Sequence, residues 1–153
     1  MTFILAAMHL NEVNAFQALG EYKKAINSYE TAIHMDPNFS SAYFNLGVLF
    51  QELGEFKKAV SYYEKATHYA PDNLAYVHSL SVLKKEILDI DLKKAILNIM
   101  NHKDCTKRNL AYGNFLLAQY EQQDHNYKKE FDYLLKGHQF YFESRRNHYI
   151  YES

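Results

Sequence analysis

Apolar residues along residues 40–73 recur at the spacing of two short helices joined by a corner. One face of the first helix is defined by four residues at i, i+3, i+4 and i+7, namely Tyr43, Leu46, Gly47 and Phe50. Gly54 interrupts this pattern, and a second face follows at Ala59, Tyr63, Ala66 and Ala70. Pro71 closes the second helix, because proline disfavours helical geometry in the residue before it. The pattern therefore predicts a helical hairpin.

The same pattern is present 34 residues earlier in the chain. The segment GEYKKA at residues 20–25 returns almost unchanged as GEFKKA at residues 54–59. The earlier copy places matching residues at Phe16, Gly20, Ala25, Tyr29, Ala32 and Pro37. Asn38 and Asp72 keep the same interval, and we expect each to cap the helix that follows it. A period of this length is typical of stacked helical hairpins.

These residues resemble the tetratricopeptide repeat (TPR) family, whose pattern combines aromatic, leucine–glycine, corner-glycine, alanine and proline positions. Residues 40–73 fill those places in order with Tyr43, Leu46, Gly47, Phe50, Gly54, Ala59, Tyr63, Ala66 and Pro71. The copy at residues 6–39 departs at its start, where the expected aromatic, leucine and glycine are replaced by His9, Glu12 and Val13. The resemblance implies an all-α fold, a right-handed TPR-type solenoid of antiparallel helix pairs.

Residues 74–153 continue the pattern in degenerate form, and we expect residues 1–153 to form a single helical repeat domain. In the first copy, a corner at Gly20 is expected to separate helices over residues 2–19 and 22–35. Further helices are predicted over residues 74–87, 92–100, 110–122 and 125–140. The polar segment over residues 101–109 is expected to be a loop, with Asp104 or Thr106 as the N-cap of the helix that follows. Most of the 14 tyrosines and 10 phenylalanines are expected to pack between helices.

The segment over about residues 83–148 shows a second, narrower resemblance. It is similar to the helical region that joins TPR repeats to the sulfotransferase domain in bacterial TPR-sulfotransferase proteins. The matching positions are Tyr127, Phe131, Leu134, Gly137, His138, Arg145 and Arg146. The glycine-rich phosphosulfate-binding loop of the catalytic domain has no counterpart in this sequence. The resemblance therefore implies at most the non-catalytic arm of such an enzyme.

The composition narrows the classes of partner. A formal net charge of -1 provides no field that would attract nucleic acid or an acidic membrane. Cys105 is the only cysteine, so an internal disulfide cannot form, which fits a reducing compartment. No segment approaches the roughly 18 apolar residues of a membrane span, and the N-terminus lacks the basic region of a signal peptide. We therefore expect a cytoplasmic protein that binds neither nucleic acid nor membrane.

The sequence predicts no catalytic, cofactor or metal site. The eight histidines include no H-x-x-x-H pair, and His102 and Cys105 lack the two further ligands that a zinc site requires. Nothing around Cys105 matches a nucleophile signature. Carboxylates near lysines are better explained as helix-stabilising pairs than as acid–base groups. We expect no cofactor, no metal and no enzymatic activity in this chain.

In the family, the first helix of each repeat lines a groove that holds a peptide or a helix. By family position, the lining residues here are Leu10, Asn14, Gln17, Phe44, Asn45, Val48, Gln51, His78, Ser79 and Lys85. Asn14 and Asn45 also match a family clamp for C-terminal carboxylates. The cations of that clamp are replaced by Leu10, Ala75 and Ser79. We exclude the clamp, because a buried carboxylate there would be uncompensated.

The resemblances leave two functions open. The first is a non-catalytic scaffold that binds a peptide or a partner domain through the groove. The second is the docking or substrate-positioning arm of a sulfotransferase whose catalytic domain is absent from this chain. The groove residues also have an alternative role, since this face could instead support folding or dock a neighbouring domain.

Overall fold

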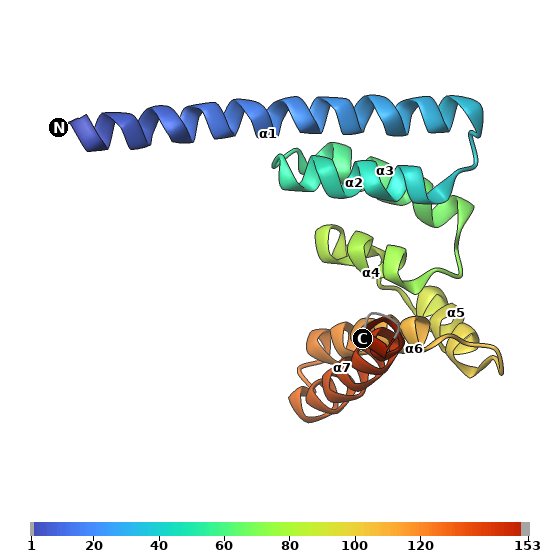
Figure 1. The fold of residues 1–153 in the computed structure, drawn as a ribbon. Coiled ribbons are helices and arrows are strands. Elements are labelled where there is room, and N and C mark those ends of the chain that lie inside the picture. The colour runs from blue at the N-terminus through green and yellow to red at the C-terminus, as the bar shows by residue number, and fades with distance from the viewer. Residues whose placement is uncertain (1, 151–153) are drawn as a thin grey trace. The chain divides into compact units, whose positions relative to one another are not determined.

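The computed structural model is helical throughout the part of the chain that it describes, which is the backbone of residues 2–150 and the side chains of residues 18–146. Within this range the chain forms seven α-helices and no strand, arranged as in Figure 1. They are α1 (Thr2–Met35), α2 (Ser40–Glu52), α3 (Phe56–Tyr69), α4 (Leu74–Leu83), α5 (Ile90–Asn101), α6 (Lys107–Gln123) and α7 (Tyr127–Ile150). A short 3-10 helix, η1 (Lys85–Ile87), follows α4. The all-α fold class is confirmed.

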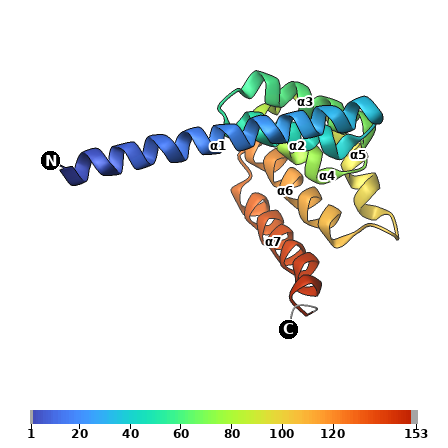
Figure 2. The ribbon, with the colours of Figure 1, turned by 45° about the horizontal axis from the view of Figure 1, so that its top comes forward.

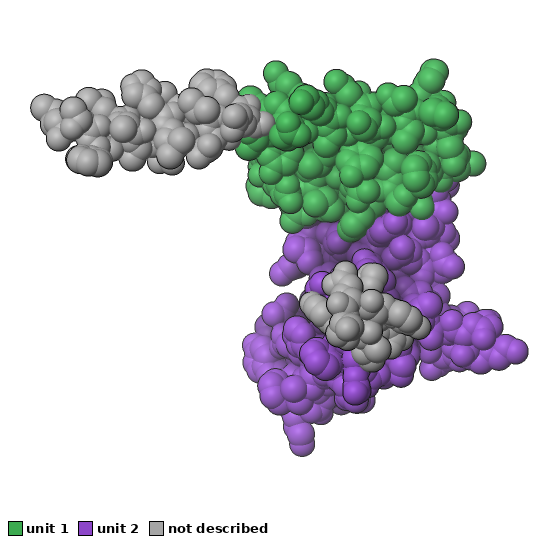
Figure 3. Space-filling view, viewed as in Figure 1, with its two compact units in different colours: residues 1–65 green, residues 66–153 purple. Residues whose placement is uncertain are grey.

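The chain divides into two compact units, residues 1–65 and residues 66–153 (Figure 3). Each unit has its own packing and is described by itself. The single repeat domain expected from the sequence stays a prediction.

In the first unit, α1 is one continuous helix of 34 residues, so the predicted corner at Gly20 is wrong (Figure 2). Of the glycines in the described range, only Gly54 has a positive φ, at 77°. Gly20 therefore keeps helical geometry, which costs only about 1 kcal/mol relative to alanine. A corner there would require the first half of α1 to pack back on the second half. The sequence weakens that packing, because His9, Glu12 and Val13 replace the aromatic, leucine and glycine of the repeat.

The hairpin of α2 and α3 follows the sequence prediction closely. Its contact surface is buried at Tyr43, Leu46, Gly47, Phe50, Ala59, Tyr63 and Ala66. A Cβ atom added at Gly47 would lie 2.5 Å from Cδ1 of Tyr63, so only glycine fits where the helices meet. The Tyr63 hydroxyl donates a hydrogen bond to Oε1 of Gln51 at 2.7 Å. The positive φ of Gly54 makes the corner between the helices, as predicted.

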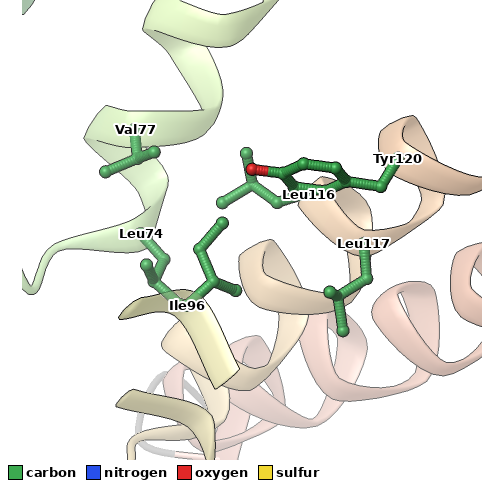
Figure 4. Close-up of a cluster of buried hydrophobic side chains, with 6 residues drawn as sticks. All are labelled: Leu74, Val77, Ile96, Leu116, Leu117 and Tyr120. Carbon is green, nitrogen blue, oxygen red and sulfur yellow. The ribbon is translucent and has the colours of Figure 1, made fainter. Parts of the chain in front are cut away.

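The second unit is built on a hydrophobic cluster contributed by three helices (Figure 4). The cluster consists of Leu74 and Val77 from α4, Ile96 from α5, and Leu116, Leu117 and Tyr120 from α6. The Tyr120 hydroxyl donates to the backbone carbonyl of Asp89 at 2.7 Å. Burial, together with the charge of Asp89, raises the pKa of Tyr120 to about 12. The phenol is therefore neutral and works as a hydrogen-bond donor at any physiological pH.

The helix starts differ in part from the predictions. Thr106 caps α6 as expected, since its Oγ1 accepts a hydrogen bond from the Asn109 backbone N–H at 3.1 Å. Asn38 and Asp72 are not caps, because the residues directly before α2 and α4 are Phe39 and Asn73, and neither provides a side-chain cap.

The start of α4 is instead completed from α6. Oδ1 of Asn109 accepts a hydrogen bond from the Leu74 backbone N–H at 3.1 Å. Nδ2 of the same residue donates to the Asp72 carbonyl at 2.9 Å. The predicted helix over residues 74–87 is interrupted at Lys84, where φ is -136° and α4 ends.

Helix α7 carries an exposed apolar stripe, although most aromatic side chains of residues 18–146 are buried or half-buried. Tyr127 and Phe131 are 64% and 61% exposed, and Leu135 and Phe142 are also exposed. The opposite side of α7 packs on α6 at Gly137, where an added Cβ would lie 2.5 Å from the ring of Phe115. Hydrophobic spacing alone does not reveal which apolar face of a helix is covered.

The two glycines of the GEYKKA and GEFKKA segments should respond in opposite directions to alanine. We predict that Gly20→Ala raises the free energy of unfolding by up to about 1 kcal/mol, because Gly20 lies inside a helix with no atom within 4 Å of an added Cβ. Gly54→Ala should lower it by about 1–2 kcal/mol, because an L-residue is strained at positive φ. Urea denaturation followed by circular dichroism measures both. Destabilisation by Gly20→Ala would contradict the continuous α1.

Asn109 should contribute to stability through the cap that it supplies to α4. We predict that Asn109→Ala lowers the free energy of unfolding by about 1–2 kcal/mol, since it leaves the Leu74 N–H and the Asp72 carbonyl without that side chain. Asn98→Ala on α5, at an exposed position, is the matched control and should change stability by less than about 0.5 kcal/mol. Equal effects of the two variants in urea denaturation would show that the Asn109 bridge is not formed.

Candidate functional site

Four of the predicted groove residues lie on α2 and are half-buried, namely Phe44, Asn45, Val48 and Gln51. They lie on the side of α2 that is not part of its buried contact face. Phe44 packs near Tyr63, with ring centroids 5.4 Å apart, and Gln51 accepts the Tyr63 hydroxyl. These two residues therefore also hold the hairpin together. Asn45 and Val48 are the α2 candidates whose side chains can be changed with least effect on that packing.

The remaining predicted residues of the first unit lie on α1. Leu10, Asn14 and Gln17 fall outside the residues whose side chains the structure describes. Their place in the groove stays a prediction.

The predicted groove residues of the second unit are His78, Ser79 and Lys85, and the structure separates them. His78 and Ser79 lie on α4 and are half-buried, whereas Lys85 is exposed in η1, after α4 has ended. The Ser79 hydroxyl donates to the Ala75 carbonyl of its own helix at 3.2 Å. Of the three, His78 lines a cleft.

The cleft at His78 has a volume of about 340 Å³ and is formed by α4, α6 and α7. Its lining consists of His78, Phe115, Ala118, Gln119, Gln122, Glu130, Leu134 and His138. The Phe115 ring contacts both histidines, with centroids 5.8 Å from His78 and 5.0 Å from His138. Burial lowers the pKa of His78, so its imidazole is neutral near pH 7. The side-chain oxygen of Gln119 is buried without a hydrogen-bond partner.

Sequence reasoning missed the α6 and α7 side of this cleft. Leu134 and His138 appeared only as matches to the second resemblance, and the α6 residues appeared only as part of the helix predicted over residues 110–122. The available signal was the pair of small residues Gly113 and Gly137, which mark close helix contacts. A Cβ at Gly113 would collide with the side chain of Met100, just as one at Gly137 would collide with Phe115.

A wider hollow of about 640 Å³ lies elsewhere in the second unit. It is lined by Pro71, Asp72, Ala95, Asn98, Ile99, His102, Asp104, Cys105, Thr106 and Asn109. Nδ1 of His102 accepts a hydrogen bond from the Asp104 backbone N–H at 3.2 Å. Burial raises the pKa of the Cys105 thiol, so the thiol stays protonated and is a poor nucleophile. Across the described residues, no group of three or more histidine, cysteine, aspartate or glutamate side chains could hold a metal ion.

Two ion pairs, Lys24–Glu21 and Lys58–Glu55, have the i, i+3 spacing expected of local stabilisation, whereas Lys107 pairs with Glu143 between α6 and α7 at 3.2 Å. The Lys58 ammonium lies 2.7 Å from the Glu55 carboxylate, three residues away on exposed surface. Among the residues that the structure describes, no helix combines the length and apolar character needed to cross a bilayer.

Comparison with known protein families identifies part of the chain. A family model described as TPR repeat matches residues 14–54, and a model described as tetratricopeptide repeat matches residues 40–73. No curated protein matches the chain. The family matches end before the segment that resembles the sulfotransferase-associated region, and that resemblance stays a prediction.

The matched residues include the α2–α3 hairpin and its Gly54 corner. Such repeats are typically non-catalytic and generally mediate protein–protein interaction. Residues 14–73 are therefore similar to tetratricopeptide repeats, and the described part of the chain contains helices and no strand.

Proposed function

We propose that this protein is a non-catalytic interaction scaffold that binds a peptide or a partner domain through the first helices of its repeats. The observation that carries the proposal is the tetratricopeptide match over residues 14–73. The division of α2 supports it, because the buried residues Tyr43, Leu46, Gly47 and Phe50 lie on one face and the half-buried Asn45 and Val48 lie on another. That second face is the one used for ligands in the family.

The chemistry of the α2 surface suits a peptide. The Asn45 amide can both donate and accept hydrogen bonds, which matches a peptide backbone. Val48 and Phe44 add apolar contact area beside it. The surface lacks the cations of a carboxylate clamp at the family positions, where Leu10, Ala75 and Ser79 stand. We therefore expect recognition of an internal segment of the partner rather than of its terminal carboxylate.

The test measures the affinity of a partner identified by affinity purification and mass spectrometry. The purified partner should bind Asn45→Ala/Val48→Ala about tenfold more weakly than it binds the unchanged protein, because truncation removes one polar and one apolar contact. Isothermal titration calorimetry gives both dissociation constants. This variant leaves Tyr63, Gln51 and the hairpin contact intact.

The matched control is Lys57→Ala/Ser61→Ala on exposed positions of α3. This control should bind the partner with unchanged affinity. Equal affinity of the α2 variant and the unchanged protein would contradict the assignment of this surface. Weaker binding by the α3 variant alone would place the interaction on the other side of the hairpin.

A further inference from the structure

The α4–α6–α7 cleft, defined above by the residues around His78, contains a buried acceptor that the protein itself does not satisfy. The Oε1 atom of Gln119 is shielded from solvent and has no hydrogen-bond partner. Leaving a buried carbonyl unpaired is costly, and such atoms are rare in folded proteins. Gln119 lines the cleft, so a turn of its side-chain amide toward the cleft would let this oxygen accept a hydrogen bond from a bound molecule.

The walls of the cleft are suited to an aliphatic chain. Ala118 is buried, Leu134 is half-buried, and the Phe115 ring contacts both histidine rings. The absence of a side chain at Gly137 lets the Phe115 ring sit close against α7. The volume of about 340 Å³ is at the small end of the range of about 300–1,000 Å³ for ligand pockets. This size fits one long side chain better than a whole peptide segment.

The charge of the cleft selects the sign of the ligand. Glu130 is the only lining residue with a carboxylate, and no lysine or arginine is among the residues that line the cleft. Burial keeps His78 neutral at physiological pH. An anionic ligand would meet the Glu130 charge without a compensating cation, whereas a cation would be attracted. The Phe115 ring offers a cation a further favourable face.

We propose that this cleft receives a lysine or arginine side chain of a partner peptide. The aliphatic stem lies along Ala118, Leu134 and Phe115. The cationic head donates to the Glu130 carboxylate and to Gln119 Oε1, whose amide turns toward the cleft on binding. Recognition of this kind satisfies the buried acceptor and matches both the shape and the charge of the cleft. The inference rests on the proposed scaffold function, since it names the class of side chain that a partner presents.

The test uses the full chain and small probes in place of a partner. N-acetyl-lysine-N-methylamide is titrated against the protein, and the ring resonances of His78, His138 and Phe115 are followed by NMR. N-acetyl-norleucine-N-methylamide has a similar apolar stem without the charge, and N-acetyl-glutamate-N-methylamide carries the opposite charge. We expect saturable shifts with the lysine probe and at least about fivefold weaker binding of both other probes.

Two variants connect the selectivity to the named groups. Gln119→Met keeps the length of the side chain but removes the acceptor, and Glu130→Gln removes the charge. Each substitution should weaken the binding of the lysine probe about tenfold, as expected when a hydrogen bond to a charged group is lost. Gln119→Met should fold at least as well as the unchanged protein, because it replaces an unpaired buried carbonyl by an apolar group. Gln123→Met, at an exposed position of α6, is the matched control and should bind the probe normally.

Three outcomes would overturn the inference. These are equal binding of lysine and norleucine probes, stronger binding of the glutamate probe, and full binding of the lysine probe by Gln119→Met. The calorimetric test of Asn45→Ala/Val48→Ala measures partner binding and is independent of the probe titration. Weakened partner binding by the α2 variant without lysine selectivity here would refute only this inference. Lysine selectivity here with no effect of the α2 variant would refute only the α2 assignment.

Discussion

The close approach of α2 and α3 is the constraint on which the first unit depends. Gly47 lies against the Tyr63 ring, at a distance that leaves no room for a Cβ atom. Tyr63 in turn is buried, and its hydroxyl is fixed by Gln51 on α2. Ala59 is fully buried in the same hairpin. Its small side chain lets the two helices approach closely, and a larger one would overpack the contact. One absent side chain thus sets the packing of a whole aromatic ring.

This packing also determines which surface is available for recognition. A helix of 13 residues such as α2 has room for one contact face and one outer face. Since Tyr43, Leu46, Gly47 and Phe50 are committed to the contact, Asn45 and Val48 remain on the outer face. A similar contact occurs in the second unit, where Gly137 lies close to the Phe115 ring. That ring contacts two histidines in the cleft. In both units, glycine at a helix contact positions the side chains beside it.

The sequence predicted those features that the repeat pattern encodes locally. The Gly54 corner, the buried Ala59, Tyr63 and Ala66, and the Thr106 cap were all within reach of spacing and capping rules. Gly20 was not, although the segment around it is nearly identical to that around Gly54. Whether such a glycine bends or continues a helix depends on the segment that must fold back, and that information lies elsewhere in the chain.

The remaining differences also come from contacts between distant residues. The cap of α4 comes from Asn109, 35 residues away, so no rule that looks at neighbouring positions could find it. The exposed Tyr127 and Phe131 have the spacing of packed aromatics, because periodicity identifies an apolar face and not what covers it. The cleft around Gln119 joins α4, α6 and α7, and its residues become neighbours only after the helices have packed.

The most direct test of the account is the stability of Gly47→Ala. The added methyl group would occupy the space of the Tyr63 ring, so the account predicts that the free energy of unfolding falls by about 1–3 kcal/mol. Urea denaturation followed by circular dichroism measures this change. Unchanged or increased stability would contradict the central role of the α2–α3 contact, since alanine is otherwise the better helix former.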